Sequence, residues 1–220
     1  MAKKKTIRTI PQERTPMREQ DAQVRAKNWD EVACGYSLED ALRESERCLM
    51  CPDEPCIAGC PVGIDIPGFI QKIGEKNLRG AYDILTDTNL LPSICGRVCP
   101  QENQCEGVCT VGESLEAVAI GRLERFVGDA AIKEGWVNIP YIEPNRFRVG
   151  IVGSGPAGMA CAADMAKAGC DVTVYEAFHQ PGGVLRYGIP DFRLPNEVID
   201  AEINNLKKFG VKFECNTLVG

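Results

Sequence analysis

The chain lacks the features that mark membrane, secreted and nucleic-acid-binding proteins. Its 220 residues contain no run of 18 apolar residues of the kind that spans a bilayer. The stretch from Met1 to Lys5 contains three lysines and no apolar segment of the kind found in signal peptides. A formal net charge of −6 argues against nucleic acid as a general partner. We therefore expect a cytoplasmic protein of one or two domains with no nucleic-acid or membrane partner.

Histidine is nearly absent, whereas cysteine is abundant. His179 is the one histidine, and there are 12 cysteines. Disulfides do not persist in a reducing cytosol, so clustered cysteines there are more often metal ligands or redox groups. Eight lie in two runs, Cys48 to Cys60 with spacing C-x2-C-x4-C-x3-C-P and Cys95 to Cys109 with spacing C-x3-C-P-x4-C-x3-C. Four others are expected to be small buried residues: Cys34, Cys161, Cys170 and Cys215.

Three kinds of site compete for the eight clustered cysteines. Zinc favours paired C-x2-C knuckles, and only Cys48 and Cys51 have that spacing. The single histidine lies outside both runs, which excludes a zinc site of two cysteines and two histidines. A proline follows Cys60 and Cys99, as it does in ferredoxin-type motifs. The pattern favours two [4Fe-4S] clusters, with structural zinc and non-metal thiols as the alternatives.

The first part of the chain is predicted to be helical. Residues 1–35 are polar and without a sustained period, so we expect an extended arm. A helical domain is expected over residues 36–140, because apolar residues there recur at helical spacing. The stretch 90–110 has little periodicity, and we expect metal ligation to give it its shape. The predicted helices begin near Ser37, Asp65, Asn77 and Glu116.

The pattern changes after a proline-containing linker at 138–145. Alternation of a strand, a small-residue helix and a second strand predicts a βαβ unit with a parallel sheet. The expected elements are a strand at 147–152, a helix at 156–168, a strand at 171–175, a helix from Asn196 and a strand at 211–213.

A glycine-rich loop lies between the first strand and its helix. Gly153, Ser154, Gly155, Pro156, Ala157 and Gly158 make up this loop. Its glycines allow a tight turn and close backbone approach, and the helix N-terminus presents N–H groups to a pyrophosphate. Glu176 ends the second strand about 20 residues further on, where a carboxylate accepts hydrogen bonds from ribose hydroxyls and repels a 2′-phosphate. The loop therefore favours FAD or NAD over NADP.

The order of these motifs resembles one family. Both cysteine spacings, the run 60–67, the loop at 153–158 and the run 188–195 are similar to the N-terminal part of the glutamate synthase small subunit. The same part occurs in the large subunit of NADH-dependent ferredoxin:NADP oxidoreductase and at the N-terminus of dihydropyrimidine dehydrogenase. The resemblance implies an α+β multidomain fold: an N-terminal all-α domain holding two [4Fe-4S] clusters, then the βαβ start of a Rossmann-like FAD-binding domain over 146–220, incomplete at residue 220.

The resemblance also implies how the ligands are divided between the two clusters. One cluster would be held by Cys48, Cys51, Cys56 and Cys109. The other would be held by Cys60, Cys99 and Cys105, with a non-cysteine side chain from the following helix as its fourth ligand. That ligand is a glutamine in the pyrimidine enzyme, and the matching motif here ends at Glu124. The alternative is that Cys95 completes the second site.

The same resemblance assigns the first dinucleotide loop to FAD. Gly183 and Val184 match a second FAD contact, and Arg193 and Val219 match further contact positions. NAD(P)H would bind in a second domain of this kind, outside residues 1–220. We expect a fragment, or a chain completed by another, that retains FAD weakly or not at all, because a sheet of about three strands with an exposed edge is a poor free-standing unit.

The implied activity is that of an NAD(P)H-dependent oxidoreductase subunit of the glutamate synthase small-subunit type, forming part of the catalytic unit. It would pass electrons between NAD(P)H, FAD and two [4Fe-4S] clusters to a glutamate synthase large subunit. One alternative is the large subunit of an electron-bifurcating NADH-dependent ferredoxin:NADP oxidoreductase, with that enzyme's small subunit and ferredoxin as partners. Another is a non-catalytic electron-relay and docking module completed by another chain. No catalytic side chain is assigned.

Overall fold

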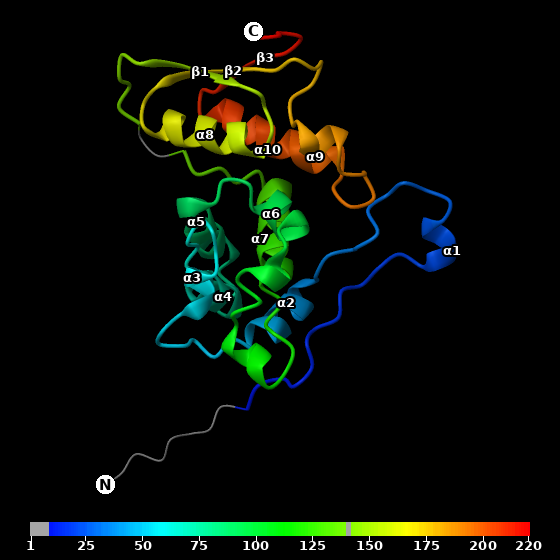
Figure 1. Cartoon of the computed structure of the whole chain (residues 1–220). Helices are drawn as coiled ribbons and strands as arrows, with labels where there is room; N and C mark the ends of the chain where they lie inside the picture. The colour runs from blue at the N-terminus through cyan, green and yellow to red at the C-terminus, as the bar shows by residue number, and fades with distance from the viewer. Residues whose placement is uncertain (1–8, 140–141) are drawn as a thin grey trace.

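The protein is described here from a computed structural model that covers residues 9–139 and 142–220. We call residues 9–139 the helical half and residues 142–220 the sheet half. Figure 1 shows the sheet half lying across one end of the helical half, with the arm looping out to the side. Residues 1–8 of the expected arm and residue 140 of the expected helical domain lie outside the described residues.

Short helices joined by turns build the helical half. Two of them, α4 and α5, pack side by side, and α6 packs along α7. The helices are α1 (Ala22–Arg25), α2 (Leu38–Ser45), α3 (Pro55–Ala58), α4 (Ile66–Gly74), α5 (Leu78–Thr88), α6 (Pro92–Val98) and α7 (Ile120–Glu134), with 3-10 turns at Gln101–Asn103 and Thr110–Glu113.

Capping side chains explain where three of these helices begin. Ser37 and Asp40 form a reciprocal capping box at the start of α2. The side chain of Asp65 accepts a hydrogen bond from the Gly68 N–H at the start of α4, and Asn77 caps α5 in the same way. These three helix starts were expected from the sequence. The helix expected from Glu116 begins four residues later, and α6 was not expected.

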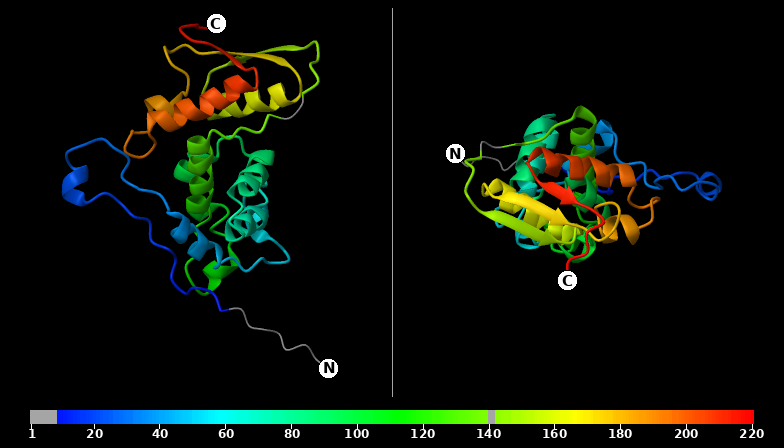
Figure 2. Two further views of the ribbon diagram at one scale, coloured as in Figure 1. Left: turned by 180° about the vertical axis from the view of Figure 1, so that it is seen from behind. Right: turned by 90° about the horizontal axis from the view of Figure 1, so that it is seen from above.

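The sheet half contains three parallel strands in the order β1-β2-β3. They are β1 (Arg148–Val152), β2 (Asp171–Tyr175) and β3 (Lys212–Glu214), and the helices are α8 (Pro156–Lys167), α9 (Val184–Tyr187) and α10 (Asn196–Lys208). The expected βαβ unit with a parallel sheet is therefore confirmed. Helices α8 and α10 lie between the sheet and the helical half, and the view from above in Figure 2 shows the strands uncovered on their other face within the described residues.

Two hydrophobic cores organise the chain, and α6 joins the second one. The first core lies in the helical half and includes Phe69, Leu85 and Leu123. The second lies under the sheet, but it also includes Leu91, at the start of α6, and Ile94, within it. A helix that belongs to the helical half along the chain thus packs into the core of the sheet half.

The arm contacts both halves. The N–H of Val32 donates a hydrogen bond to the carbonyl of Phe192 at 2.9 Å, and the ring of Trp29 lies 6.0 Å from the ring of Phe192. On the helical side, Glu31 accepts two hydrogen bonds from Arg97 in α6. None of the described helices combines the length and apolar character that crossing a membrane requires.

The scattered cysteines differ from the expectation in part. Cys34 and Cys161 are exposed, so the prediction that they are small buried residues is wrong. Neither cysteine belongs to a core: Cys34 lies in the arm, and Cys161 lies on the exposed side of α8. Cys170 and Cys215 are half-buried.

Candidate cluster and dinucleotide sites

The first cysteine cavity lies between α3, α4 and the start of α7. Its lining includes Cys48, Cys51, Cys56 and Cys109, which are the four members of the first predicted ligand set. Cys48 follows α2, Cys56 lies in α3, and Cys109 precedes the second 3-10 turn. The apolar walls come from α4 and from the segment before α7, and the thiol of Cys51 lies 3.4 Å from the hydroxyl of Thr110.

The backbone around this cavity is held in an uncommon conformation. Met50 has a φ of 53° and Glu54 has a φ of 44°, both in the left-handed region that non-glycine residues rarely adopt. Glu54 is the residue directly before α3, so the turn it makes directs Cys56. Strain of this kind concentrates at functional sites, where the surrounding structure enforces it.

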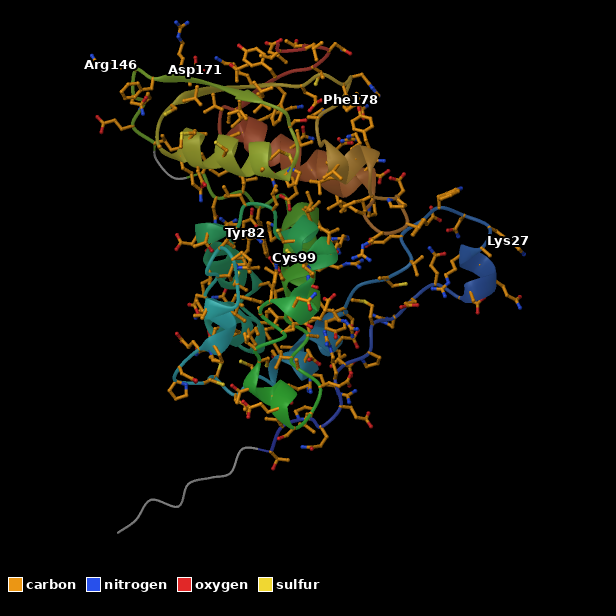
Figure 3. The ribbon with its side chains drawn as sticks, in the orientation of Figure 1. Lys27, Tyr82, Cys99, Arg146, Asp171 and Phe178 are labelled. Atoms are coloured by element: carbon orange, nitrogen blue, oxygen red, sulfur yellow. The ribbon has the colours of Figure 1, made fainter. Side chains whose placement is uncertain are left out.

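The second cysteine cavity lies between α4, α6 and α7. Its lining includes Cys60, Cys99, Cys105 and Glu124, which are the four members of the second predicted set. Cys99 is the residue that ends α6, and Glu124 lies in α7. Figure 3 labels Cys99, which lies among the helices of the helical half on the side that faces the sheet half. This cavity is the larger of the two, about 110 Å³ against about 20 Å³.

Both candidates for the eighth ligand face the second cavity. Glu124 is buried, and its Oε1 accepts a hydrogen bond of 2.6 Å from the side-chain nitrogen of Asn89. The oxygen of the same Asn89 side chain lies 3.5 Å from the thiol of Cys95 and accepts a hydrogen bond from the Leu91 N–H. Sequence reasoning missed Asn89, which fixes both candidates through one amide.

Burial makes negative charge unfavourable in both cavities. It is the main reason that the pKa of Cys56 rises to about 11, with Cys48 and Cys109 adding to the effect. Burial likewise raises the pKa of Cys105 to about 12 and that of Glu124 to about 8. A bound cation in either cavity would offset these costs, since ligating thiols and carboxylates bind metals as anions.

One thiol departs from this trend. The hydrogen bond from Cys95 lowers the pKa of Cys99 to about 7. The same contact with Cys99, together with burial, raises the pKa of Cys95. Of the two, Cys99 is thus the thiol that ionises more readily, which suits a ligand.

The described residues do not favour a site for a single metal ion. No group of three or more histidine, cysteine, aspartate or glutamate side chains within 9–139 and 142–220 is arranged to hold one ion. A zinc ion would need its four ligands gathered tightly in a tetrahedron.

The glycine-rich loop has the tight packing that its sequence predicts. Gly153 has a φ of 93°, which favours glycine, and its N–H donates to the carbonyl of Tyr175 at 2.8 Å. A side chain on Gly158 would collide with the carbonyl oxygen of Gly153. A side chain on Gly183 would lie 2.7 Å from the Cα of Gly155. The structure thus brings the loop, the start of α8 and the second predicted contact together.

Glu176 lies directly against this loop. The side chain is buried, and it accepts hydrogen bonds from the Ser154 N–H at 2.9 Å, from the Ser154 hydroxyl and from the Phe178 N–H at 2.9 Å. Burial raises the pKa of Glu176, but these donors outweigh it and hold that pKa below its usual value. The Gly182 N–H in turn donates to the Ser154 hydroxyl at 3.0 Å. An ionised acceptor is therefore fixed beside the loop.

The remaining predicted contact residues lie on the surface. Val184 is the first residue of α9 and is exposed, next to Gly183. Arg193 is exposed in the turn before α10, and Val219 is half exposed in the segment after β3. The side chain of Arg193 makes no hydrogen bond or ion pair with any residue in the described ranges. The structure thus gathers the glycines and Glu176, and adds no contact that ties Arg193 or Val219 to the loop.

The fold and these sites define a class: a helical domain with two cysteine-lined cavities joined to a Rossmann-type dinucleotide fold. The profile of the family described as dihydropyrimidine dehydrogenase domain II, 4Fe-4S cluster, matches residues 25–136. This match covers half of the chain, and the chain belongs to this family. A second profile, described as an NAD(P)-binding Rossmann-like domain, matches residues 151–212.

Relatives at 36–40% identity match most of the chain. The NAD-dependent dihydropyrimidine dehydrogenase subunit PreT of Escherichia coli K12 is 40% identical over 191 residues, which are 87% of this chain and 46% of the relative. The glutamate synthase [NADPH] small chains of Halomonas elongata and Azospirillum brasilense are 36% and 37% identical over 200 residues, about 90% of this chain and 42% and 41% of the relatives. The chain thus spans a little under half the length of these curated relatives.

Proposed function

We propose that the chain is part of an NAD(P)H-dependent oxidoreductase subunit that carries two [4Fe-4S] clusters and FAD and passes electrons to a partner subunit. The observation that carries this proposal is the division of the cysteines between two cavities. Each cavity is lined by the four side chains of one predicted ligand set, although each set draws on both cysteine runs. Such a division follows from the fold and not from neighbouring positions in the chain.

The residues fit the proposed clusters chemically. Thiolates are the usual ligands of [4Fe-4S] clusters, and the carboxylate of Glu124 would make the second site unlike an all-cysteine site. The first cavity, about 20 Å³, has room for little more than one water, so its thiols would have to move outward on loading. The strained turn at Met50 and Glu54 is the segment whose relaxation would provide that movement.

The dinucleotide loop is proposed to hold FAD. When bound, FAD supplies the conversion of a two-electron hydride transfer into single-electron steps that clusters can accept. In this chain the N-terminus of α8 would face the pyrophosphate, and Glu176 would accept from ribose hydroxyls. Gly183 and Val184 would form the second contact, and Arg193 and Val219 further ones. Each chain residue here binds or orients, and none is assigned a proton-transfer role.

Two kinds of partner subunit are proposed from the relatives. The glutamate synthase small chains suggest a glutamate synthase large subunit. PreT, named as a subunit of an NAD-dependent dihydropyrimidine dehydrogenase, suggests a subunit that acts on pyrimidines, and it matches with the higher identity. Copurification from the native cell, followed by identification of the associated chain, distinguishes the two.

The test of the proposal is the metal and flavin content of the chain purified without oxygen. We expect about eight irons and eight acid-labile sulfides per chain, the content of two [4Fe-4S] clusters. We expect little or no FAD, because one face of the three-stranded sheet is uncovered within the described residues. Stoichiometric zinc without iron would contradict the proposal. About four irons per chain would mean that the chain holds one cluster and not two.

A further inference from the structure

Helix α6 connects the sheet half to the second cysteine cavity. At one end of it, Leu91 and Ile94 pack into the core beneath the sheet. At the other end, α6 stops at Cys99, which lines the second cavity together with Cys95 from the same helix. The position of Cys99 is therefore set by whatever holds α6.

A buried carboxyl group of the sheet half caps α6. The first N–H groups of a helix have no acceptor within the helix, and no side chain of the helical half caps α6. The Ser93 N–H instead donates to Oε1 of Glu202 in α10, at 3.2 Å. Both residues are buried, with 3% of Glu202 and none of Ser93 exposed. Helix α10 also packs directly on α6.

The rest of α6 is clamped, so a shift at its start would be transmitted to its end. Arg97 is bound by Glu31 of the arm and by both carboxylate oxygens of Asp129 in α7. A side chain on Gly96 would lie 2.4 Å from the backbone nitrogen of Arg125, which shows how closely α6 lies against α7. A helix held this tightly moves as a unit.

We propose that Glu202 is a positioning residue that couples the sheet half to the second cavity through α6. It holds the first turn of α6 and thereby sets where Cys99 and Cys95 enter that cavity. The first cavity receives no residue of α6, so the coupling is selective. The statement about cluster properties rests on the proposed function, whereas the statement about α6 rests on the contacts alone.

The first test uses amide hydrogen exchange in the wild-type chain, purified without oxygen. A first-turn N–H without an acceptor exchanges readily, so protection at Ser93 reports the bond to Glu202. We expect the Ser93 amide to be protected and to open together with α10. Exchange of Ser93 as fast as that of an unprotected first-turn amide would overturn the proposal without any variant.

The second test compares three variants. Glu202→Leu removes the acceptor at similar volume, Glu202→Gln keeps an acceptor oxygen, and Glu197→Ala changes an exposed carboxylate on the same helix. We expect Glu202→Leu to raise exchange across α6 on the order of tenfold, because a buried N–H loses its partner. Glu202→Gln and Glu197→Ala should leave it unchanged. An equal rise in α4 and α5 would mean general destabilisation, and that result would overturn the selective coupling.

The third measurement reads the second cluster. In the reduced chain, the electron paramagnetic resonance signal of one cluster should change in Glu202→Leu, that of the other should not, and Glu202→Gln should restore the wild-type spectrum. Identical spectra in wild type and Glu202→Leu would overturn the coupling to the cavity. A chain purified without any clusters would contradict the proposed function. The amide hydrogen exchange measurements would still decide whether Glu202 positions α6.

Discussion

The side-chain amide of Asn89 contacts several groups around the second cavity. The nitrogen of the Asn89 side chain holds Glu124, and its oxygen faces the thiol of Cys95 and the Leu91 N–H. An amide can serve both neighbours because it carries a donor and an acceptor on one planar group. Glu124 and Cys95 thereby line the same cavity, and either of them could serve as the proposed eighth ligand.

Removing each candidate in turn tests that choice. We predict that Glu124→Ala lowers iron from about eight to about four per chain, the content of one [4Fe-4S] cluster. Cys95→Ala should keep about eight irons, because it leaves the proposed ligand in place. The measurement is iron and acid-labile sulfide in anaerobically purified variants. The reverse pattern would make Cys95 the eighth ligand and Glu124 a buried neighbour.

Ionisation of Glu202 should make the folding stability of the chain fall as pH rises. Burial raises its pKa to about 8 from the ordinary 4.5, although the Ser93 N–H opposes the shift. The folded chain thus holds a proton that the unfolded chain has released, so stability falls as pH rises from about 4.5 to about 8. Glu202→Gln cannot ionise, and we predict that its melting temperature at pH 8 exceeds that of wild type by roughly 10 °C. The shift in pKa corresponds to up to about 5 kcal/mol of stability, and 1 kcal/mol corresponds to about 2–4 °C in a chain of this size.

The control for this prediction lies on the same helix. At pH 5 the melting temperatures of Glu202→Gln and wild type should be alike, because the carboxyl is then protonated in the folded chain. Glu197→Gln, at an exposed position, should differ little from wild type at either pH. If the difference in melting temperature between Glu202→Gln and wild type were the same at pH 5 and pH 8, the raised pKa of Glu202 would be contradicted.

The sequence could predict which cysteines share a cavity but not the residues that support them. Cysteine spacing and Cys-Pro pairs are local, and the division into two sets came from a family resemblance. Asn89 and Glu202 act over long separations: Asn89 lies 35 positions from Glu124, and Ser93 lies 109 positions from Glu202. Neither stands in a motif, so only the packing of α6 and α10 brings them to their partners.

At the scale of elements, the closest packing is that of α6 along α7. Two glycines allow it. A side chain on Gly96 would lie 2.4 Å from the Arg125 nitrogen, and a side chain on Gly128 would lie 2.6 Å from the Ser93 nitrogen. Because both obstacles are backbone atoms, neither can move aside as a flexible side chain would. The two helices approach at the distance that these glycines set.

Substitution of these glycines should separate the helices. We predict that Gly96→Ala and Gly128→Ala each destabilise the chain by about 1–3 kcal/mol, the usual cost of overpacking. Gly74→Ala is the matched control, because a side chain there would make only an ordinary contact of 3.5 Å with the Ser45 hydroxyl. It should leave stability unchanged or raise it by about 0.5–1 kcal/mol. Denaturant unfolding of the three variants measures this, and equal midpoints would contradict it.

Helix starts were predictable where a local cap exists, as at Ser37, Asp65 and Asn77. Helix α6 was not, because its seven residues include proline and glycine and its cap comes from another part of the chain. Short helices gain most of their stability from tertiary packing, and here that packing is the core beneath the sheet. Local propensity carries no signal for such an element.

For the whole molecule, motif order predicted a helical part followed by a parallel sheet, but not how the two meet. The contact between them is made by α10 on α6 and α7, by the arm at Phe192 and by Lys167, which donates to the carbonyl of Thr86 at 3.1 Å. These contacts join residues that are remote along the chain. The sequence contains no pattern that marks them.

Charge is distributed unevenly along the chain, and under the proposed function this would affect electron exchange. The segments 48–71 and 98–121, which carry seven of the eight proposed ligands, contain seven carboxylates and no lysine or arginine. One of these carboxylates, Glu106, is paired with Arg14 of the arm. These two segments are therefore acidic, and an electron acceptor approaching them would meet a negative field.

The salt dependence of electron transfer to small acceptors tests this field. We predict that oxidation of the reduced chain by a cationic acceptor, hexaammineruthenium(III), slows as salt rises, whereas oxidation by anionic ferricyanide accelerates, because the field is screened over about 10 Å at 0.1 M salt. The rate with each acceptor is compared only with its own rate at other salt concentrations, so the difference in driving force between the two acceptors does not enter. Asp53→Asn combined with Glu54→Gln should flatten both slopes, and Glu197→Gln in the sheet half should not. Rates that are independent of salt with both acceptors would show that the carboxylates around the cavities do not steer electron exchange.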